Sequence, residues 1–470
     1  MAGEARTLPA RTSGQQGLRG NPQLGDPLAG LHVTVPGSDA TAWHAGRMLS
    51  WLGAAVVCDA QPTGEPEQWA ASGLMALTGL RDGVPLAAPG QVASAVEGAL
   101  LAIRLLARVC GREVELPDAR LLSERAAYAG LHRDAPRSPG GSFRILRAAD
   151  DWLGVNLARS SDIELLPAWL EEPDPVLDRA VAQRSAVELA AAARVLGLPV
   201  AVLGGKPDEQ LIARGQCEGV HPFKLTGRSR SDQWTLPPTV VVDLSSLWAG
   251  PLCGHLLNAL GARVIKVESI HRLDGARGGP RRFYDLLHAG QESVAIDFTT
   301  VAGRAVLAQL IDIADVVIEA SRPRALEQLG IHAEEVLSRG TDKCWVSITG
   351  YGRVGPWSNA VGFGDDTAFA AGLVAFDPET GIPAPCGDAI ADPVTGVNAA
   401  LVALACRMSG GWWLADLAMR EQVAAALETP SEPAHAVEAA DPTARSPCGT
   451  APASGVDTTR VLAEFGIGPK

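Results

Sequence analysis

The stretch from Val240 to Glu268 constrains the fold more than any other part of the chain. It reads VVVDLSSLWAGPLCGHLLNALGARVIKVE: an apolar run, a Gly-Pro turn, an amphipathic segment, and a second apolar run that ends in Lys266 and Glu268. This order of patterns predicts a β-α-β unit and hence an α/β fold class. The loop has neither the three glycines of a dinucleotide-binding fingerprint nor the Gly-Lys-Ser/Thr of a P-loop, which argues against both usual nucleotide sites.

Composition narrows the possible partners and the compartment. The 470 residues are enough for two or three domains, and a formal charge of −13 argues against nucleic acid or an anionic membrane as the main partner. The eight cysteines show no Cys-x-x-Cys and no His pair at zinc spacing, which predicts free thiols and no metal site. No apolar core follows Arg6 and Arg11, and charges interrupt every long apolar run. We therefore expect neither a signal peptide nor a transmembrane helix, and a cytoplasmic location.

The chain also resembles itself. Residues 45–57 (AGRMLSWLGAAVV) parallel residues 253–265 (CGHLLNALGARVI) at an offset of 208, and residues 71–102 parallel residues 370–401. Such pairs predict two diverged copies of one unit.

Three short motifs in the stretch from Val240 to Glu268 resemble a known family. Asp-Leu-Ser at 243–245, Ala-Gly-Pro at 249–251 and Leu-Gly-Ala-x-Val-Ile-Lys-Val-Glu at 260–268 are similar to the start of the class III CoA-transferases, which include carnitine CoA-transferase, formyl-CoA transferase and α-methylacyl-CoA racemase. The resemblance covers residues 238–427 strongly and 28–205 weakly, as a diverged tandem fusion. It implies a Rossmann-like large domain with a parallel sheet and a smaller α+β domain, internally duplicated.

The resemblance also implies how the chain is divided. In this family the sites of interlocked dimers lie where the large domain of one subunit meets the small domain of the other. Here each copy lacks what the other keeps, so we expect a pseudo-dimer within one chain, with a homodimer left open. The expected parts are a disordered tail (1–27), a truncated first-copy large-domain segment (28–135), a small domain (136–205), a linker (206–237), a second-copy CoA-binding large domain (238–428), a linker (429–447) and a C-terminal return helix (448–470).

Asp392 is the candidate catalytic residue. On local grounds, Asp followed by Pro at the head of an apolar helix predicts an N-cap. The resemblance implies that Asp392 is a nucleophile, and a helix N-terminus would keep it ionised. The first copy has Ser94 at the aligned position, which predicts an inactive copy. Asp388 is expected to be a solvated or turn-forming loop residue.

The resemblance further implies contacts to coenzyme A, which is expected as a thioester substrate, with no permanently bound cofactor and no metal. The short loop from His271 to Arg282 carries four arginines against Asp274, which gives an anion site independent support. A glycine-rich turn at 350–356 could offer backbone amides to an oxyanion. The expected contacts are Leu247, Trp248, Ala249, Lys266, Arg272, Arg277, Ala320, Ser321, Arg322, Gly350 and Tyr351.

The predicted function is therefore an acyl-CoA:carboxylate CoA-transferase that works through an aspartyl anhydride and an aspartyl-CoA thioester, with an acyl-CoA and a carboxylic acid as partners. One alternative is an acyl-CoA racemase or isomerase that uses Asp392 as a base. The sequence has Phe363, Gly364 and Asp365 where the racemases keep a His-Asp pair, which disfavours this alternative. Another alternative is an inert CoA-binding or scaffold protein, because Gln291 and Gln328 stand where many members are basic.

Overall fold

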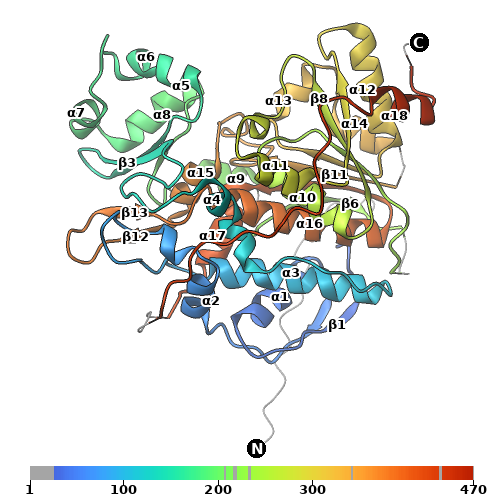
Figure 1. The fold of residues 1–470 in the computed structure, drawn as a ribbon, viewed down its shortest axis with the longest axis horizontal. Coiled ribbons are helices and arrows are strands. Elements are labelled where there is room, and N and C mark those ends of the chain that lie inside the picture. Colours follow the sequence, from blue (N-terminus) through green and yellow to red (C-terminus); the bar gives the residue numbers. More distant parts are fainter. Residues whose placement is uncertain are drawn as a thin grey trace, which may run out of the picture.

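The computed structural model describes residues 26–205, 208–214, 220–230, 234–339, 342–432 and 437–468. These residues form a large sheet with its helices, a smaller part built from residues 26–130, and a lobe set to one side (Figure 1). Within the described ranges, no helix has both the length and the apolar character needed to cross a membrane.

The large part is organised by a seven-stranded sheet in the order β6-β14-β11-β10-β7-β8-β9, in which β6 alone is antiparallel to its neighbour. Its central strands are short apolar runs buried on both faces, as parallel sheets require. The expected α/β class with a parallel-rich sheet is confirmed. The strands are β6 (Lys224–Arg228), β7 (Val240–Asp243), β8 (Arg263–Ser269), β9 (Glu292–Ile296), β10 (Val316–Glu319), β11 (Lys343–Thr349) and β14 (Trp412–Ala418).

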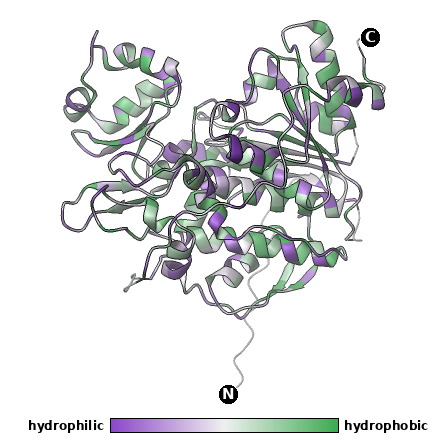
Figure 2. Cartoon of the chain, in the orientation of Figure 1, coloured by the Kyte–Doolittle hydropathy of each residue, from purple (hydrophilic) through white to green (hydrophobic). Residues whose placement is uncertain are grey.

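Alternating residues of these strands pack on opposite layers. Val241 belongs to the core shared with α10 and α16, whereas Val242 belongs to the core shared with α12 and α14. Hydrophobic residues occur on the strands and along the helices beside them, interspersed with hydrophilic residues (Figure 2). The helices of this part are α10 (Ala249–Ala259), η3 (Gly275–Gly278), α11 (Arg281–His288), α12 (Val301–Ile313), α13 (Pro323–Glu327), α14 (Ala333–Ser338), α15 (Gly364–Ala371), α16 (Ala391–Ser409) and α17 (Met419–Leu427), with a hairpin of β12 (Val374–Phe376) and β13 (Pro383–Pro385) between α15 and α16.

The first part repeats the order of elements in the second on a smaller scale. Its two strands form a separate parallel sheet, and α3 packs against both α1 and α16. The pairs β1-α1-β2 and β7-α10-β8 match in order, as do the long helices α3 and α16. The elements are β1 (His32–Thr34), α1 (Ala40–Trp51), β2 (Ala55–Val57), α2 (Glu65–Ala71), η1 (Met75–Leu77), α3 (Val92–Val109), η2 (Ala119–Ser123) and α4 (Glu124–Ala129).

The match of α3 with α16 corrects one alignment. Ser94 is the third residue of α3, whereas Asp392 is the second residue of α16. The position equivalent to Asp392 is therefore Ala93, because the starts of the two helices set their register.

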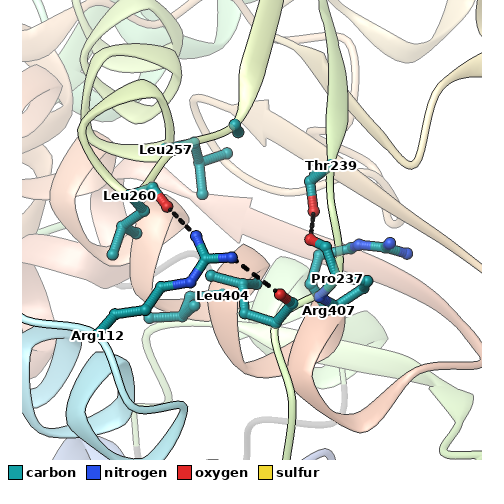
Figure 3. A pocket seen from close by; sticks show the side chains of 10 residues that line it. Arg112, Pro237, Thr239, Leu257, Leu260, Leu404 and Arg407 are labelled. Carbon is teal, nitrogen blue, oxygen red and sulfur yellow. Dashed lines mark hydrogen bonds between the residues drawn. The ribbon is translucent and has the colours of Figure 1, made fainter.

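Arg112 joins the two parts at the end of α3. Its Nη1 donates to the carbonyl oxygen of Leu260 at 2.8 Å, and its Nη2 donates to that of Leu236 at 3.1 Å (Figure 3). These bonds border a cavity of about 20 Å³, lined by Leu257 and Leu404 among others. One guanidinium thus satisfies two backbone carbonyls of the second part.

The lobe is a three-stranded antiparallel sheet, ordered β3-β4-β5, with four short helices. Its core contains Trp169, whose indole donates to the carbonyl oxygen of Leu189 at 2.9 Å. The elements are β3 (Phe143–Arg147), β4 (Trp152–Asn156), α5 (Ser160–Glu164), α6 (Leu166–Leu170), α7 (Leu177–Ala182), α8 (Ala186–Leu196) and β5 (Val200–Val202).

The stretch 206–237, read as a linker from its polarity, holds regular structure in its described part. Helix α9 (Asp208–Arg214) packs its buried Gln210 on the glycine-rich turn, where the Gln210 amide donates to the carbonyl oxygen of Tyr351 at 2.7 Å. Strand β6 pairs with β14. The expectation was wrong here because tertiary pairing, rather than local pattern, makes these elements regular.

The C-terminal strap, defined as residues 437–456, crosses from the first part to the second without helix or strand. The guanidinium of Arg445 binds Glu124 of α4 at 2.6 Å, and the amide of Ala451 donates to Asp285 of α11 at 2.9 Å. The strap leads to α18 (Thr458–Glu464), which packs beside β9 and lies close to the C-terminus.

Candidate functional site

Asp392 lies in the first turn of α16 but does not cap it. The helix begins at Ala391 with Ile390 as its N-cap, and no side chain caps it. The turn at Ala389, which has a left-handed backbone with φ of 46°, lets the helix start earlier than the Asp-Pro pattern indicates. The N-cap interpretation is therefore wrong, and the Asp392 carboxylate is free for other contacts.

Two neighbouring elements hold the Asp392 side chain. The backbone amide of Ala249, at the start of α10, donates to its carboxylate. Gly364, the first residue of α15, lies so close that a Cβ there would stand 2.3 Å from Asp392 Oδ2 and 2.2 Å from the carbonyl oxygen of Ala389. Only glycine permits this approach, so α15 and α10 together fix the carboxylate.

A cluster of carboxylates and one guanidinium surrounds Asp392. Asp388 is fully buried and accepts from Arg125 Nε at 2.8 Å and Nη2 at 2.6 Å. Asp365 of α15 accepts from the amide of Ala389 at 2.7 Å. The expectation that Asp388 is solvated is therefore wrong, because Arg125 reaches it from α4 of the first part.

Burial controls the ionisation of this cluster. Desolvation raises the pKa of Asp392 to about 7, with Asp365 and Asp388 adding to the rise while Arg125 and the Ala249 amide oppose it. Burial and the charge of Asp388 raise the pKa of Asp365 to about 6. The Asp392 side chain remains partly exposed to solvent. The helix N-terminus therefore does not by itself keep Asp392 ionised, because desolvation outweighs it.

The lobe forms one wall beside these residues. Asn156 of β4 donates to Asp366 of α15 at 2.9 Å, and the rings of Phe143 and Phe369 lie 5.5 Å apart. A cavity of about 10 Å³, enough for about one water, lies between the lobe and Asp365. It is lined by Phe143, Asp365, Ala368, Phe369, Leu373, Pro385, Cys386 and Ile390.

The loop before α10 lies next to Asp392. Leu247 is 42% exposed and has a left-handed backbone with φ of 73°, held by a bond from its amide to Asp274 at 2.9 Å. Trp248 is buried edge-on against Phe283, 5.3 Å away. The structure thus brings Ala249 to Asp392, leaves Leu247 accessible, and uses Trp248 for packing.

Two of the expected phosphate ligands are committed elsewhere. Lys266 is 1% exposed, and its ammonium binds Asp274 at 2.9 Å; Asp243 and Asp274 together raise its pKa against the effect of burial. Arg277 pairs with Glu268 at 2.5 Å and stacks on Tyr284. Neither group is presented to a ligand. The charge count of the 271–282 loop missed the pairing of Arg277 because its partner Glu268 lies outside the loop.

Arg272 and Arg322 remain as candidates for an anion. Burial lowers the pKa of Arg322, and the nearby charges of Arg324, Arg159 and Arg272 lower it further. Arg272 lies in the loop after β8, and Arg322 and Arg324 lie at the start of α13. Arg159 of the lobe adds its charge to this cluster, but its guanidinium already pairs with Asp162 at 2.5 Å. Ala320 is exposed and Ser321 is half-buried. Both follow β10 and directly precede Arg322 in the sequence.

The glycine-rich turn follows β11. Gly350 is buried and its carbonyl oxygen accepts from the amide of Arg420 at 3.2 Å, while the Tyr351 ring packs inward, 5.2 Å from Trp357. The amide of Gly352 donates to Thr349 at 2.7 Å. The Gly352 amide is thus already bonded within the turn. That the backbone amides of Gly350 and Tyr351 bind an oxyanion stays a prediction.

Sequence reasoning missed Arg125, Asp365 and the buried role of Asp388. Asp365 and Asp388 could have been singled out as acids flanking Asp392 in the same family-like segment. Arg125 lies 263 residues from its partner Asp388, and no local pattern marks it.

The comparisons with known proteins concern the second half of the chain. A family model described as CoA-transferase family III matches residues 236–431. A succinyl-CoA–D-citramalate CoA-transferase of Chloroflexus aurantiacus is 33% identical over 202 residues, which are 40% of this chain and 50% of that protein. The human succinyl-CoA:glutarate CoA-transferase is 31% identical over 185 residues, covering 37% and 42%. The chain thus spans about half the length of the curated relatives it matches.

One solved structure is similar to part of the chain. A CAIB/BAIF family protein from Brucella suis shares 26% identity with a TM-score of 0.36 and covers 41% of this chain and 55% of that one. Residues 236–431, which match the family model, contain β7 to β11, β14, α10, α15 and Asp392. This part of the chain is similar to CoA-transferase family III.

Proposed function

We propose that the protein is an acyl-CoA:carboxylate CoA-transferase in which Asp392 is the covalent nucleophile. The observation that supports this most directly is the position of its carboxylate. It lies on the family-matched segment, in a partly exposed residue, and is fixed by Gly364 and the Ala249 amide.

The proposed reaction exchanges CoA in balanced steps. An Asp392 oxygen attacks the thioester carbonyl carbon, the C–S bond breaks, and CoA thiolate leaves a mixed anhydride. The thiolate then attacks the Asp392 carbonyl carbon, which releases the donor acid as a carboxylate and leaves an aspartyl-CoA thioester. The acceptor carboxylate attacks the carbonyl carbon of this thioester, the C–S bond breaks, and CoA thiolate leaves a new mixed anhydride. The thiolate finally attacks the acceptor carbonyl, which gives the new acyl-CoA and regenerates aspartate.

We assign the CoA phosphates to the arginine cluster of Arg272, Arg322 and Arg324; Arg159 is left out because Asp162 already pairs with its guanidinium. Their mutual repulsion, seen in the lowered pKa of Arg322, is relieved when an anion binds among them. Lys266 and Arg277, expected from the resemblance, are replaced in this role because acids already neutralise them.

We further propose one site per chain, formed by the second-part sheet and the lobe. The bond between Asn156 and Asp366 and the packing of Phe143 on Phe369 support it. In the family the lobe of a second polypeptide closes the site; here the same chain supplies it. We propose that an internal duplication placed the sheet and the lobe of one site in the same chain.

Trapping the covalent intermediate tests the function. The protein is incubated with a panel of acyl-CoAs, starting with succinyl-CoA because two relatives are named for it, and treated with hydroxylamine or borohydride. Peptide mass spectrometry should find the label on Asp392. Asp392→Ala should abolish labelling and CoA transfer, whereas Ser94→Ala on the equivalent helix should leave both unchanged. A label on another residue contradicts the proposal.

The racemase alternative keeps one supporting observation. A carboxylate whose pKa is about 7 suits proton abstraction at neutral pH. Solvent deuterium that enters the α-carbon of an acyl-CoA would favour the racemase, whereas CoA that moves between acids favours the transferase. A protein that binds CoA but does neither is a scaffold.

A further inference from the structure

The candidate site contains a cation that comes from outside the family-matched segment. Arg125 lies on α4, whereas the family model begins at residue 236. No sequence motif and no comparison assigns it a role. Its guanidinium nevertheless contacts the residues around Asp392.

The contacts of Arg125 are fixed in geometry. Nε and Nη2 bind the two oxygens of Asp388 as a bidentate fork, which is the most directional arrangement of an ion pair. Gly140 backs this pair, because a Cβ there would lie 2.9 Å from Asp388 Oδ1 and 3.0 Å from Arg125 Nη2. The guanidinium also faces the Trp248 ring at 5.8 Å. Arg125 is therefore held between the second-part loops and is still 32% exposed.

The charges that face Asp392 come from three elements. Asp365 lies on α15, Asp388 lies in the turn before α16, and Arg125 lies on α4, while α10 contributes a backbone amide. Three carboxylates thus meet one guanidinium in a desolvated site. Asp388, Asp365 and Asp392 all raise the pKa of Arg125 against the effect of burial, so Arg125 interacts with each of them.

We propose that Arg125 is a positioning residue for the proposed transfer reaction: through its fork with Asp388 it places a positive charge beside Asp392 and keeps this carboxylate ionised for attack. The proposal rests on the proposed function of Asp392. It also gives the first part of the chain a direct role in the chemistry, in addition to its role in packing.

Two variants that break the same ion pair distinguish charge from structure. Arg125→Gln removes the cation and leaves Asp388 as a like charge beside Asp392. The acid limb of the kcat/KM profile should therefore move up by about one pH unit, and activity at pH 7 should fall about fivefold. Asp388→Asn removes the like charge and leaves the cation, so the limb should move down. Arg125→Lys should restore most of the wild-type profile. Arg120→Gln, at an exposed arginine pair on neighbouring η2, is the control.

A second readout does not depend on turnover. Carbodiimide reacts with protonated carboxyl groups, so the pH midpoint of Asp392 labelling, followed by peptide mass spectrometry, should rise in Arg125→Gln and fall in Asp388→Asn. Shifts of the same sign in both variants, or losses of rate without a shift, overturn the proposal and leave a structural pair. If the labelling shifts as expected in a protein that transfers no CoA, the role of Arg125 stands and the proposed function fails.

Discussion

Gly364→Ala is the sharpest test of the geometry around Asp392, because it adds one methyl group and changes no charge. The new Cβ would stand 2.3 Å from Asp392 Oδ2 and 2.2 Å from the Ala389 carbonyl oxygen, where ordinary contact begins at 3.4 Å. The carboxylate or the turn must therefore move by about 1 Å, and a misplacement of that size costs on the order of 100-fold in rate. Overpacking also costs about 1–3 kcal/mol of stability.

The assay compares kcat and KM for CoA transfer with the acyl donor that trapping identifies. We expect kcat to fall about 100-fold in Gly364→Ala, with KM for the CoA ester nearly unchanged, because the arginine cluster is distant in sequence and untouched. Gly468→Ala is the matched control, since no atom lies within 4 Å of its added Cβ. Circular dichroism establishes that both variants are folded. A wild-type kcat in Gly364→Ala would refute the positioning of Asp392 by α15.

Three further outcomes are expected. Asp392→Asn should stabilise the protein at pH 8 by up to about 4 kcal/mol and change little at pH 4. Burial raises the pKa of Asp392 to about 7, so the wild-type protein loses stability as the pH rises toward that value, whereas the variant does not. A difference in denaturant midpoints that does not depend on pH contradicts this. Arg322→Gln should weaken CoA binding about tenfold with little effect on kcat, and equal binding of CoA and dephospho-CoA to the wild type would remove the 3′-phosphate from the cluster. Fragments divided near residue 233 should regain activity only when mixed, with one CoA per pair by calorimetry; full activity from residues 238–470 alone would overturn the single composite site.

The sequence predicts those features that local pattern determines. The run from Val240 to Val242 is apolar at every position, because both faces of β7 are buried, and this is the signature of a parallel strand. The β-α-β order, the glycine-rich turn and the candidate Asp392 could also be predicted, because each is marked by a local sequence pattern.

The remainder depends on contacts that span the chain. Lys266 resembles a phosphate ligand in sequence, and only the fold shows that Asp243 and Asp274 surround its ammonium. No local sequence pattern marks Arg125, because its role depends on its distant partner Asp388. The ionisation of Asp392 was also misjudged, because a sequence shows the helix dipole but not the desolvation that outweighs it.

The position of β6 has a consequence for how the chain folds. This strand precedes β7 in the chain but lies at the far edge of the sheet, where Lys224 pairs with Asp416. The edge of β14 cannot be covered until everything between the two strands has been synthesised and ordered, and such long loop closures are slow. An intermediate with an open β14 edge should therefore persist and be prone to edge-to-edge association. Low temperature and low protein concentration during refolding should raise the yield of the native protein.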